Sequence, residues 1–400
     1  MNDSTFDYII VGAGTAGCLL ANRLSADASK RVLLIEAGKR DDYHWIHIPV
    51  GYLYCIGNPR TDWLYETEAA AGLNGRTLRY PRGKVLGGCS SINGMIYMRG
   101  QSRDYNQWAA ITDDPQWRWD QCLPYFKFHE DHHQGATETH GANGVPAALL
   151  NPQAHQDAAS AEYFRVLKAR KAGGEWRIEK QRLSWGVLDA FAQAAQQAGV
   201  PASADFNQGN NEGVGYFEVN QKSGWRWNTA QAFLRPTCYG RPNFELWTQA
   251  QVARLVIETD ADGGKRCTGV KVWDGHQLVT ATATREVALS AGSIGSAQIL
   301  QLSGIGAANS LKQNGVEVMH DLPGVGANLQ DHLQIRSVYK VKHAKTLNTL
   351  ANSWWGKAKI GLEYALSRSG PMSMAPSQLG AFTKSDAQRE WANIQYHVQP

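Results

Sequence analysis

The chain has 400 residues, with 40 Lys and Arg against 36 Asp and Glu, which gives a formal net charge of +4 at pH 7. This length allows two domains and excludes a single small module. Because the charges nearly balance and no block of like charge stands out, the composition argues against a nucleic-acid partner.

The chain opens with the pattern of a strand, a glycine turn and a helix. Residues 8–11 are a β-branched and aromatic run, and Gly12, Gly14 and Gly17 follow in the G-x-G-x-x-G spacing of a dinucleotide site. Gly12 allows the tight turn, Gly14 lets a pyrophosphate approach the backbone, and Gly17 lets the helix pack close to the strand. The first free N–H groups of that helix are expected to face the phosphates.

Glu36 completes this fingerprint, because it ends the second expected strand about 20 residues after the glycines. A carboxylate there can accept hydrogen bonds from two ribose hydroxyls and disfavours a 2′-phosphate. The competing interpretation is a glycine-rich turn in another α/β protein, which the alignment of strand, helix, second strand and acid argues against. At this point both NAD and FAD remain open.

A second glycine-rich stretch covers residues 81–100, with five glycines and two serines that an ordinary helix would not tolerate. It fits a loop whose backbone N–H groups line a ligand at close range, and a plain surface connection is the alternative. Residues 104–129 have a helix-like pattern. Further helices are expected at residues 158–172 and 185–198.

The expected loop at residues 129–144 is rich in histidine. His129, His132, His133 and His140 invite a metal interpretation. No acid or cysteine stands at a fixed ligand spacing from them, so we expect no metal site.

The clearest β pattern is an antiparallel meander over residues 252–257, 268–273 and 278–284. Residues 286–290 then read as another strand, followed by a glycine turn and a helix at 291–300. Because consecutive βα units feed one sheet, we expect residues 286–290 to lie in the sheet that contains residues 8–11.

At these residues the sequence resembles the glucose–methanol–choline oxidoreductases, which are flavoprotein alcohol dehydrogenases and oxidases. The opening fingerprint and residues 83–100, 292–306 and 322–332 carry the likeness, which is greatest to bacterial choline dehydrogenases and acceptor-dependent alcohol dehydrogenases. Cys89 and Ala297 depart from the family pattern without disturbing a charge or a glycine.

The resemblance implies FAD rather than NAD as the cofactor, since an NAD dehydrogenase would leave residues 83–100 unexplained. It implies an α/β fold: an FAD-binding, Rossmann-like, doubly wound domain with an antiparallel meander, plus a partial α+β substrate-binding domain. We expect the FAD-binding domain at residues 1–155 and 206–315, and the incomplete substrate-binding domain at residues 156–205 and 316–400.

The cofactor-binding residues follow from the family pattern. Glu36 would hold the adenosine ribose and Val252 the adenine through its backbone, while residues 87–96 would form the loop over the isoalloxazine. The full expected set is Gly12, Ala13, Gly14, Thr15, Ala16, Gly17, Glu36, Ala37, Gly38, Gly87, Gly88, Ser90, Asn93, Gly94, Met95, Ile96, Val252, Ala291 and Gly292.

The resemblance further implies oxidation of the CH–OH group of a primary alcohol, with hydride transfer to flavin N5 and electrons passed to a quinone or another acceptor. Choline is the alternative substrate. Trp225, Trp227 and Tyr216 could form an aromatic cage for it, or could line an apolar alcohol pocket.

No catalytic residue is assigned, because the family's histidine base belongs to a C-terminal portion expected beyond residue 400. His332 and His397 are interpreted as structural rather than as that base. A catalytically incomplete flavin-binding fragment, or half of a split enzyme, is therefore the alternative function.

Location is inferred from composition alone. Six scattered cysteines without a C-x-x-C pair suit reduced thiols. No apolar run reaches the roughly 18 residues of a membrane-spanning helix. We expect a cytoplasmic protein, with peripheral contact with the inner membrane left open.

Overall fold

The computed structural model describes residues 4–151, 158–171 and 173–400. The chain divides into two compact units. Unit 1 contains Met1–Tyr43, Tyr54–Ile92 and Thr229–Lys340, and unit 2 contains His44–Leu53, Asn93–Asn228 and Val341–Pro400. This division by compactness differs from the expected division by cofactor and substrate contact, which remains a prediction.

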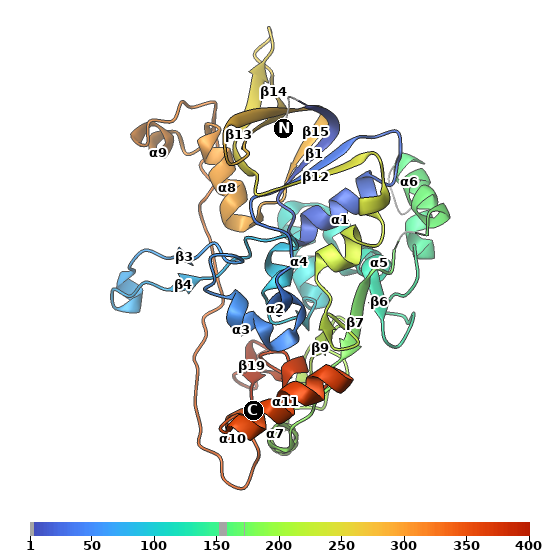
Figure 1. The fold of residues 1–400 in the computed structure, drawn as a ribbon, viewed down its shortest axis with the longest axis vertical. Helices are drawn as coiled ribbons and strands as arrows, with labels where there is room; N and C mark the ends of the chain where they lie inside the picture. The colour runs from blue at the N-terminus through green and yellow to red at the C-terminus, as the bar shows by residue number, and fades with distance from the viewer. Residues whose placement is uncertain (1–3, 152–157, 172) are drawn as a thin grey trace. The chain divides into compact units, whose positions relative to one another are not determined.

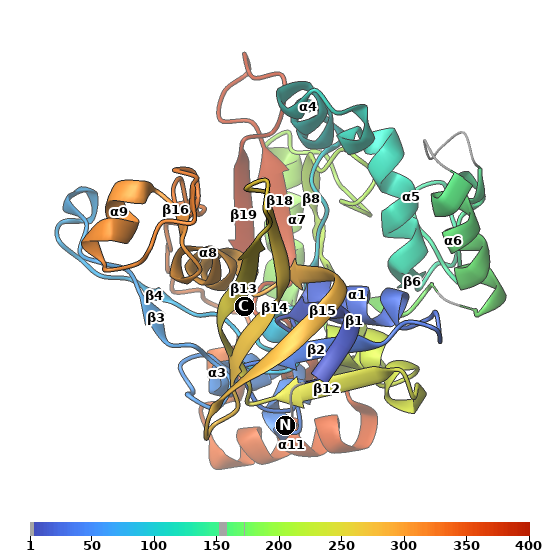
Figure 2. The same cartoon turned by 90° about the horizontal axis from the view of Figure 1, so that it is seen from above.

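A six-stranded sheet with the order β12-β2-β1-β15-β14-β13 forms the centre of unit 1 (Figures 1 and 2). The neighbours β12, β2, β1 and β15 run parallel, whereas β13, β14 and β15 form an antiparallel meander. The expected α/β class is confirmed. The strands are β1 (Ser4–Val11), β2 (Val32–Glu36), β12 (Phe244–Thr248), β13 (Gln251–Thr259), β14 (Lys265–Trp273) and β15 (Leu278–Leu289).

Strand β15 joins the two parts of this sheet. Leu278–Leu289 is one continuous strand rather than two, because its register with β1 is irregular between Phe6 and Tyr8, where Thr284 and Arg285 stand opposite the single residue Asp7. One edge of β15 pairs antiparallel with β14 and the other pairs parallel with β1. The expected return of this segment to the sheet of β1 is confirmed.

Alternating side chains of the sheet are buried on both faces. Ile9, Val11, Leu33 and Ile35 share a core with Ile299 of α8, so α8 covers that face. Their neighbours Ile10 and Leu34 point to the opposite face and are also fully buried. Burial of both faces is typical of parallel strands in a doubly wound fold. The two helices next to the glycine turns are α1 (Thr15–Leu24) and α8 (Gly292–Leu302).

The rest of unit 1 consists of short elements. The hairpin of β3 and β4 projects from the unit, as does α9 (Figure 1). These elements are α3 (Tyr52–Cys55, at the border with unit 2), β3 (Tyr65–Glu66), β4 (Arg79–Tyr80), β16 (Ile305–Gly306), α9 (Ala308–Gln313) and β17 (His320–Asp321).

Unit 2 contains a four-stranded sheet of order β5-β9-β7-β6, a three-stranded sheet of order β19-β18-β8 and the ribbon β10-β11. Its strands are β5 (Ile96–Tyr97), β6 (Glu130–His132), β7 (Trp176–Lys180), β8 (Gly213–Tyr216), β9 (Glu218–Val219), β10 (Gln221–Lys222), β11 (Trp225–Arg226), β18 (Leu379–Thr383) and β19 (Ile394–Val398).

The helices of unit 2 largely follow the sequence pattern. The expected helical stretch at residues 104–129 is two helices, because Asp113 adopts a left-handed conformation at φ 53° and Pro115 follows. Residue 172, the expected end of another helix, lies outside the described residues. The helices are α2 (His44–His47), α4 (Ser102–Thr112), α5 (Trp119–His129), α6 (Ala158–Ala169), α7 (Gly186–Gln197), α10 (Leu347–Leu350) and α11 (Trp354–Ser367).

The histidine-rich stretch and the membrane expectation can also be compared with the structure. The histidine-rich stretch expected as loop begins with strand β6, which pairs with β7. Among the helices that the structure describes, none combines the length and the apolar character needed to cross a bilayer.

Candidate functional site

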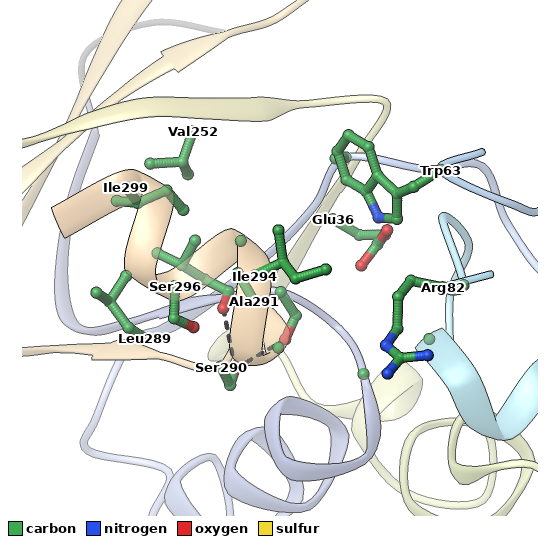
Figure 3. Close-up of a pocket in the computed structure, with 18 of the residues that line it drawn as sticks. Glu36, Trp63, Arg82, Val252, Leu289, Ser290, Ala291, Ile294, Ser296 and Ile299 are labelled. Carbon is green, nitrogen blue, oxygen red and sulfur yellow. Dashed lines mark hydrogen bonds between the residues drawn. The ribbon is translucent and has the colours of Figure 1, made fainter. Parts of the chain in front are cut away.

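A cavity of about 570 Å³ opens in unit 1 at the carboxyl ends of β1 and β2 (Figure 3). The glycine turn, the end of β2, the start of β13 and the first turns of α8 supply most of its walls. The β3–β4 hairpin and the residues that flank it add Trp63, Tyr65, Arg82 and Gly83. A cavity beside the carboxyl ends of parallel strands is where α/β sheets bind nucleotides.

The turn after β1 is held by Ser290, the residue that follows β15. The hydroxyl of Ser290 lies 3.0 Å from the Val11 carbonyl oxygen and 2.8 Å from that of Gly12. Gly12 adopts φ +95°, and a Cβ there would lie 2.6 Å from the Ser290 carbonyl oxygen. Gly12 therefore needs both its left-handed backbone and its missing side chain.

Gly17 and Gly14 differ in what surrounds them. A Cβ on Gly17 would lie 1.9 Å from the Gly12 carbonyl oxygen, whereas the closest atom to a Cβ on Gly14 would be 4.0 Å away. Gly17 thus serves the packing of α1 on the turn. Gly14 is the N-cap of α1 and faces open space, so its Cα is accessible to a ligand.

Two helix starts contribute to the cavity wall. Thr15 and Ala16 begin α1, and Gly292 begins α8, which follows Ala291. Neither helix has a side-chain cap on its first N–H groups. The uncapped N–H groups and the positive end of the α1 dipole favour an anionic group such as a pyrophosphate.

Glu36 ends β2 and its carboxylate points toward the cavity (Figure 3). The backbone N–H of Ala13 donates to Oε2 at 2.9 Å, and that of Gly38 donates to Oε1 at 2.8 Å. Burial raises the pKa of Glu36 to about 7, against the opposing effect of these two hydrogen bonds. The carboxylate is therefore held in place and sensitive to its environment near neutral pH.

The second glycine stretch packs directly on the first. The N–H of Gly87 donates to the Ala13 carbonyl oxygen at 2.8 Å. A Cβ on Gly88 would lie 2.7 Å from the Cα of Gly14. The Ser90 hydroxyl donates to the Gly87 carbonyl oxygen at 2.6 Å and lies 3.0 Å from the Thr229 hydroxyl. These contacts place the backbone of Gly88 at the cavity wall.

The structure places the expected residues in three groups. The cavity lining contains Gly12, Gly14, Thr15, Ala16, Glu36, Ala37, Gly88, Val252, Ala291 and Gly292. A supporting group, which packs behind that lining, contains Ala13, Gly17, Gly38, Gly87 and Ser90. A third group belongs to unit 2 and is absent from the lining: Asn93, Gly94, Met95 and Ile96.

Sequence reasoning missed several side chains that line the cavity, among them Trp63 and Arg82. Trp63 and Arg82 flank the hairpin and both point toward Glu36 or the open space beside it (Figure 3). The rings of Trp63 and Tyr65 stack with centroids 5.7 Å apart, and Lys84 Nζ lies 4.4 Å from the centroid of Trp63. No spacing rule marks these positions, although an aromatic and a cation beside a nucleotide cavity suit a base and a phosphate.

The described lining fits the nucleotide part of FAD. The volume lies within the usual range of about 300–1,000 Å³ for ligand pockets. A free Cα at Gly14, uncapped N–H groups at the start of α1 and a buried acid at Glu36 are the donors, acceptor and space that an adenosine diphosphate requires.

The two histidines considered from the sequence are not among the residues that line the cavity. His332 and His397 are exposed, and neither appears in the lining of the cavity. The ring of His397 lies 5.4 Å from that of Phe217, which is a packing contact.

A comparison with protein-family models matches residues 6–334 to the model described as GMC oxidoreductase. The chain is 37% identical over 404 residues to an alcohol dehydrogenase (acceptor) of Pseudomonas putida, covering 99% of this chain and 65% of the relative. It is 38% identical over 395 residues to an oxygen-dependent choline dehydrogenase of Vibrio vulnificus, covering 99% and 64%.

Solved structures agree with this result. Pyridoxine 4-oxidase of Mesorbium loti matches with a TM-score of 0.76 and 29% identity, covering 99% of this chain and 65% of that one. A formate oxidase matches with a TM-score of 0.77 and 25% identity, covering 97% and 64%. The chain thus spans slightly less than two thirds of the length of the proteins that it matches.

Proposed function

We propose that this chain, which belongs to the GMC oxidoreductase family, binds FAD in the cavity of unit 1 and contributes to oxidation of the CH–OH group of a primary alcohol. FAD is the cofactor of this family. The observation that carries the proposal is the meeting of Gly14, Gly88 and Glu36 around one cavity. When bound, FAD supplies the hydride acceptor at flavin N5 and passes electrons to a second acceptor.

The residues of the chain have distinct parts in this proposal. The N–H groups at the start of α1 hold the pyrophosphate, and Glu36 accepts hydrogen bonds from the adenosine ribose. Val252 presents its backbone to the adenine, and the guanidinium of Arg82 compensates phosphate charge. The expected isoalloxazine loop at residues 93–96 stays part of the proposal.

A primary alcohol without a positive charge is proposed over choline. The names of the relatives include both alcohol and choline dehydrogenases. Within unit 2, Arg368 lies over the ring of Trp225 at 4.7 Å, and Lys222 lies over that of Trp227 at 4.6 Å. Because cations of the protein already occupy a face of each ring, these two tryptophans are poor candidates for a cage around a quaternary ammonium.

The electron acceptor is proposed to be a quinone or another carrier. The first of the two relatives is named for an unspecified acceptor and the second for oxygen. Reoxidation of the reduced flavin by air, compared with reoxidation by a soluble quinone under nitrogen, separates these acceptors.

The test begins with the cofactor. The purified 400-residue chain should retain FAD, and acid precipitation should release it into the supernatant because the proposed contacts are all non-covalent. A yellow pellet would contradict this binding mode. Gly14→Val should abolish retention, since the added side chain occupies the space that the pyrophosphate needs.

The second test concerns the chemistry. The FAD-loaded chain is mixed anaerobically with a series of primary alcohols and with choline, and the oxidised flavin band is followed. The described lining of the cavity contains no histidine, and the lack of a general base typically costs about 10² to 10⁴ in rate, so we expect reduction much slower than the usual order of 1 s⁻¹. Faster reduction would show that a base lies within these residues, and His332 and His397 would be replaced first.

A further inference from the structure

Three histidines and three carboxylates gather inside unit 2, around β6 and β9. His132 ends β6, His133 follows it, and Glu218 begins β9 on the other side of β7 (Figure 1). Nε2 of His132 lies 3.0 Å from Glu218 Oε1, and Nε2 of His133 lies 2.8 Å from the same oxygen. Two imidazoles thus converge on one carboxylate oxygen.

This buried cluster contains more carboxylates than guanidinium groups. The side chains of Glu130, Glu218 and Asp205 are 2%, 6% and 7% exposed. Arg99 is the guanidinium paired with Glu130, and its side chain is 1% exposed. When the histidines bind a metal ion as neutral imidazoles, three carboxylates and one guanidinium leave two negative charges, which a divalent cation neutralises.

The atoms that converge have the spacing of a metal site. Bonds of about 2.0–2.1 Å to a tetrahedral zinc ion place neighbouring ligand atoms about 3.3 Å apart. The observed 2.8 Å and 3.0 Å are a few tenths shorter, and all three ligand atoms lie within 4.8 Å of one another. The side chain of His133 is 17% exposed, which gives an ion access and leaves room for a water ligand.

Neighbouring residues orient these ligands. Asn207 Nδ2 lies 3.4 Å from Glu218 Oε2, the oxygen that the two imidazoles leave free. The ring of His140 stacks on that of His132 with centroids 3.7 Å apart and an interplanar angle of 12°. Outer contacts of this kind position the ligands of metal sites.

His140 is itself held from both sides. Its Nδ1 lies 3.1 Å from Glu130 Oε2, and its Nε2 lies 2.9 Å from Asp205 Oδ2. Because His140 cannot turn without losing both carboxylates, the ring of His132 packs against a fixed neighbour.

Protonation of the ligands is compatible with an ion. In each histidine the ring proton would move from Nε2 to Nδ1 when an ion binds. For His132 this replaces only a long contact, because the Gln134 N–H lies 3.4 Å from its Nδ1.

We propose that His132 Nε2, His133 Nε2 and Glu218 Oε1 bind one divalent transition metal ion of the zinc class, with water as the fourth ligand. Imidazole and carboxylate are the ligands that such ions use. The ion ties the end of β6 to the start of β9 across β7. Sequence spacing did not reveal this site, because Glu218 lies 86 residues beyond His132.

The experiment uses the untagged, FAD-loaded chain after treatment with a chelator and dialysis. Zn²⁺ is added, excess is removed, and bound metal is measured per chain, while Co²⁺ replaces Zn²⁺ in parallel to read the coordination from its visible absorption. We expect one equivalent of either ion, a tetrahedral Co²⁺ spectrum and a higher midpoint of thermal unfolding with metal than without it.

Variants assign the ion to these residues. His133→Ala and Glu218→Gln should weaken Zn²⁺ binding by about 100-fold or more, since loss of an outer-shell partner alone commonly costs about 10- to 100-fold. His276→Ala, on the exposed turn between β14 and β15, is the matched control and should bind as the parent does. If Glu218→Gln does not fold, Zn²⁺ binding by His133→Ala tests the proposal, because His133 is partly exposed and its replacement is easier to tolerate. No retained metal in the parent, or equal binding by His133→Ala, would overturn the proposal.

Discussion

Gly88 faces Gly14 so closely that a Cβ on Gly88 would lie 2.7 Å from the Cα of Gly14. Two glycine motifs that are 74 positions apart in number, 88 − 14, therefore meet backbone to backbone. Because the opposing atom is main chain, neither side can move away as a flexible side chain would. The first glycine turn and the second glycine stretch form one structural piece, and each depends on the other.

Gly88→Ala should lower the free energy of unfolding by about 2–3 kcal/mol, from backbone strain at φ +53° together with the steric overlap. Urea unfolding of the chain without cofactor measures this loss. Gly315→Ala is the control, since Gly315 has φ +70° and no atom lies within 4 Å of the place that a Cβ would take. Gly315→Ala should lower the free energy of unfolding through backbone strain alone, by about 1 kcal/mol. Equal losses for the two variants would show that the contact between Gly88 and Gly14 does not cause the loss of stability.

Gly17→Ala and Gly14→Ala should separate folding from cofactor binding. The first places a methyl 1.9 Å from the Gly12 carbonyl oxygen and should unfold the chain or cost more than about 3 kcal/mol. The second meets no atom closer than 4.0 Å, so its stability should stay within about 1 kcal/mol while FAD is lost. Circular dichroism and retained flavin give the two readouts. FAD bound normally by Gly14→Ala would contradict the proposed pyrophosphate position.

Gly361→Ala gives a reference for both variants, because Gly361 lies in α11 and no atom is within 4 Å of an added Cβ. It should stabilise the chain by about 0.5–1 kcal/mol, the usual gain from alanine in a helix.

The affinity for FAD should fall as the pH falls below about 7. Burial raises the pKa of Glu36 to about 7 in the free chain, and the ribose hydroxyls donate to the ionised carboxylate. The proton must therefore leave on binding, so affinity is full above the raised pKa and drops about tenfold from pH 8 to pH 6. Flavin fluorescence titration at each pH measures it. Glu36→Gln should bind weakly with a flat pH profile, and an unchanged slope in this variant would assign the proton to another group.

The raised pKa of Glu36 also makes the stability of the FAD-free chain depend on pH. Because the pKa of Glu36 is raised above its ordinary 4.5, the folded state holds the proton more tightly than the unfolded state. The contribution of protonated Glu36 to the stability of the folded chain is therefore fully present below pH 4.5, and it is lost as the pH rises through about 7. The difference in unfolding free energy between the parent and Glu36→Gln, measured across this range, should show that decline.

The buried pair of Arg99 and Glu130 should be costly to break. Their side chains are 1% and 2% exposed, and Arg99→Met would leave the Glu130 carboxylate buried without its guanidinium partner. We expect a loss of about 3–5 kcal/mol in unfolding free energy. Arg165→Met is the matched control, because the pair of Arg165 with Glu162 is 60% and 64% exposed and should be worth less than about 1 kcal/mol. Similar losses for both would show that burial does not set the cost.

The fold could be predicted wherever local pattern and topology agree. The apolar run of β1, the acid at the end of β2 and the meander at residues 251–289 follow simple periodicity, and the structure contains each of them. Periodicity divided β15 in two at Arg285, between the expected strands at residues 278–284 and 286–290. Pairing with β1 on one edge, with an irregular register there, keeps the strand continuous.

The site was predictable only where function imposes a spacing along the chain. Gly12 and Glu36 occupy such positions, and both line the cavity. Trp63 and Arg82 reach the cavity through a hairpin whose sequence carries no corresponding rule. Glu218 approaches His132 only because β6 and β9 flank the same strand. A contact set by sheet order rather than by local spacing needs the folded chain to be seen.

The parallel pairing of β1 with β15 has a consequence for biosynthesis. Residues 4–11 pair with residues 281–289, so the first strand to leave the ribosome waits for one of the later ones. At about 5–20 residues per second, that interval is on the order of 10–60 s. During it one hydrogen-bonding edge of an apolar strand lacks its native partner, which invites pairing with other nascent chains. Chaperone dependence and co-translational aggregation should therefore respond to substitutions in β1 that leave the stability of the folded chain unchanged.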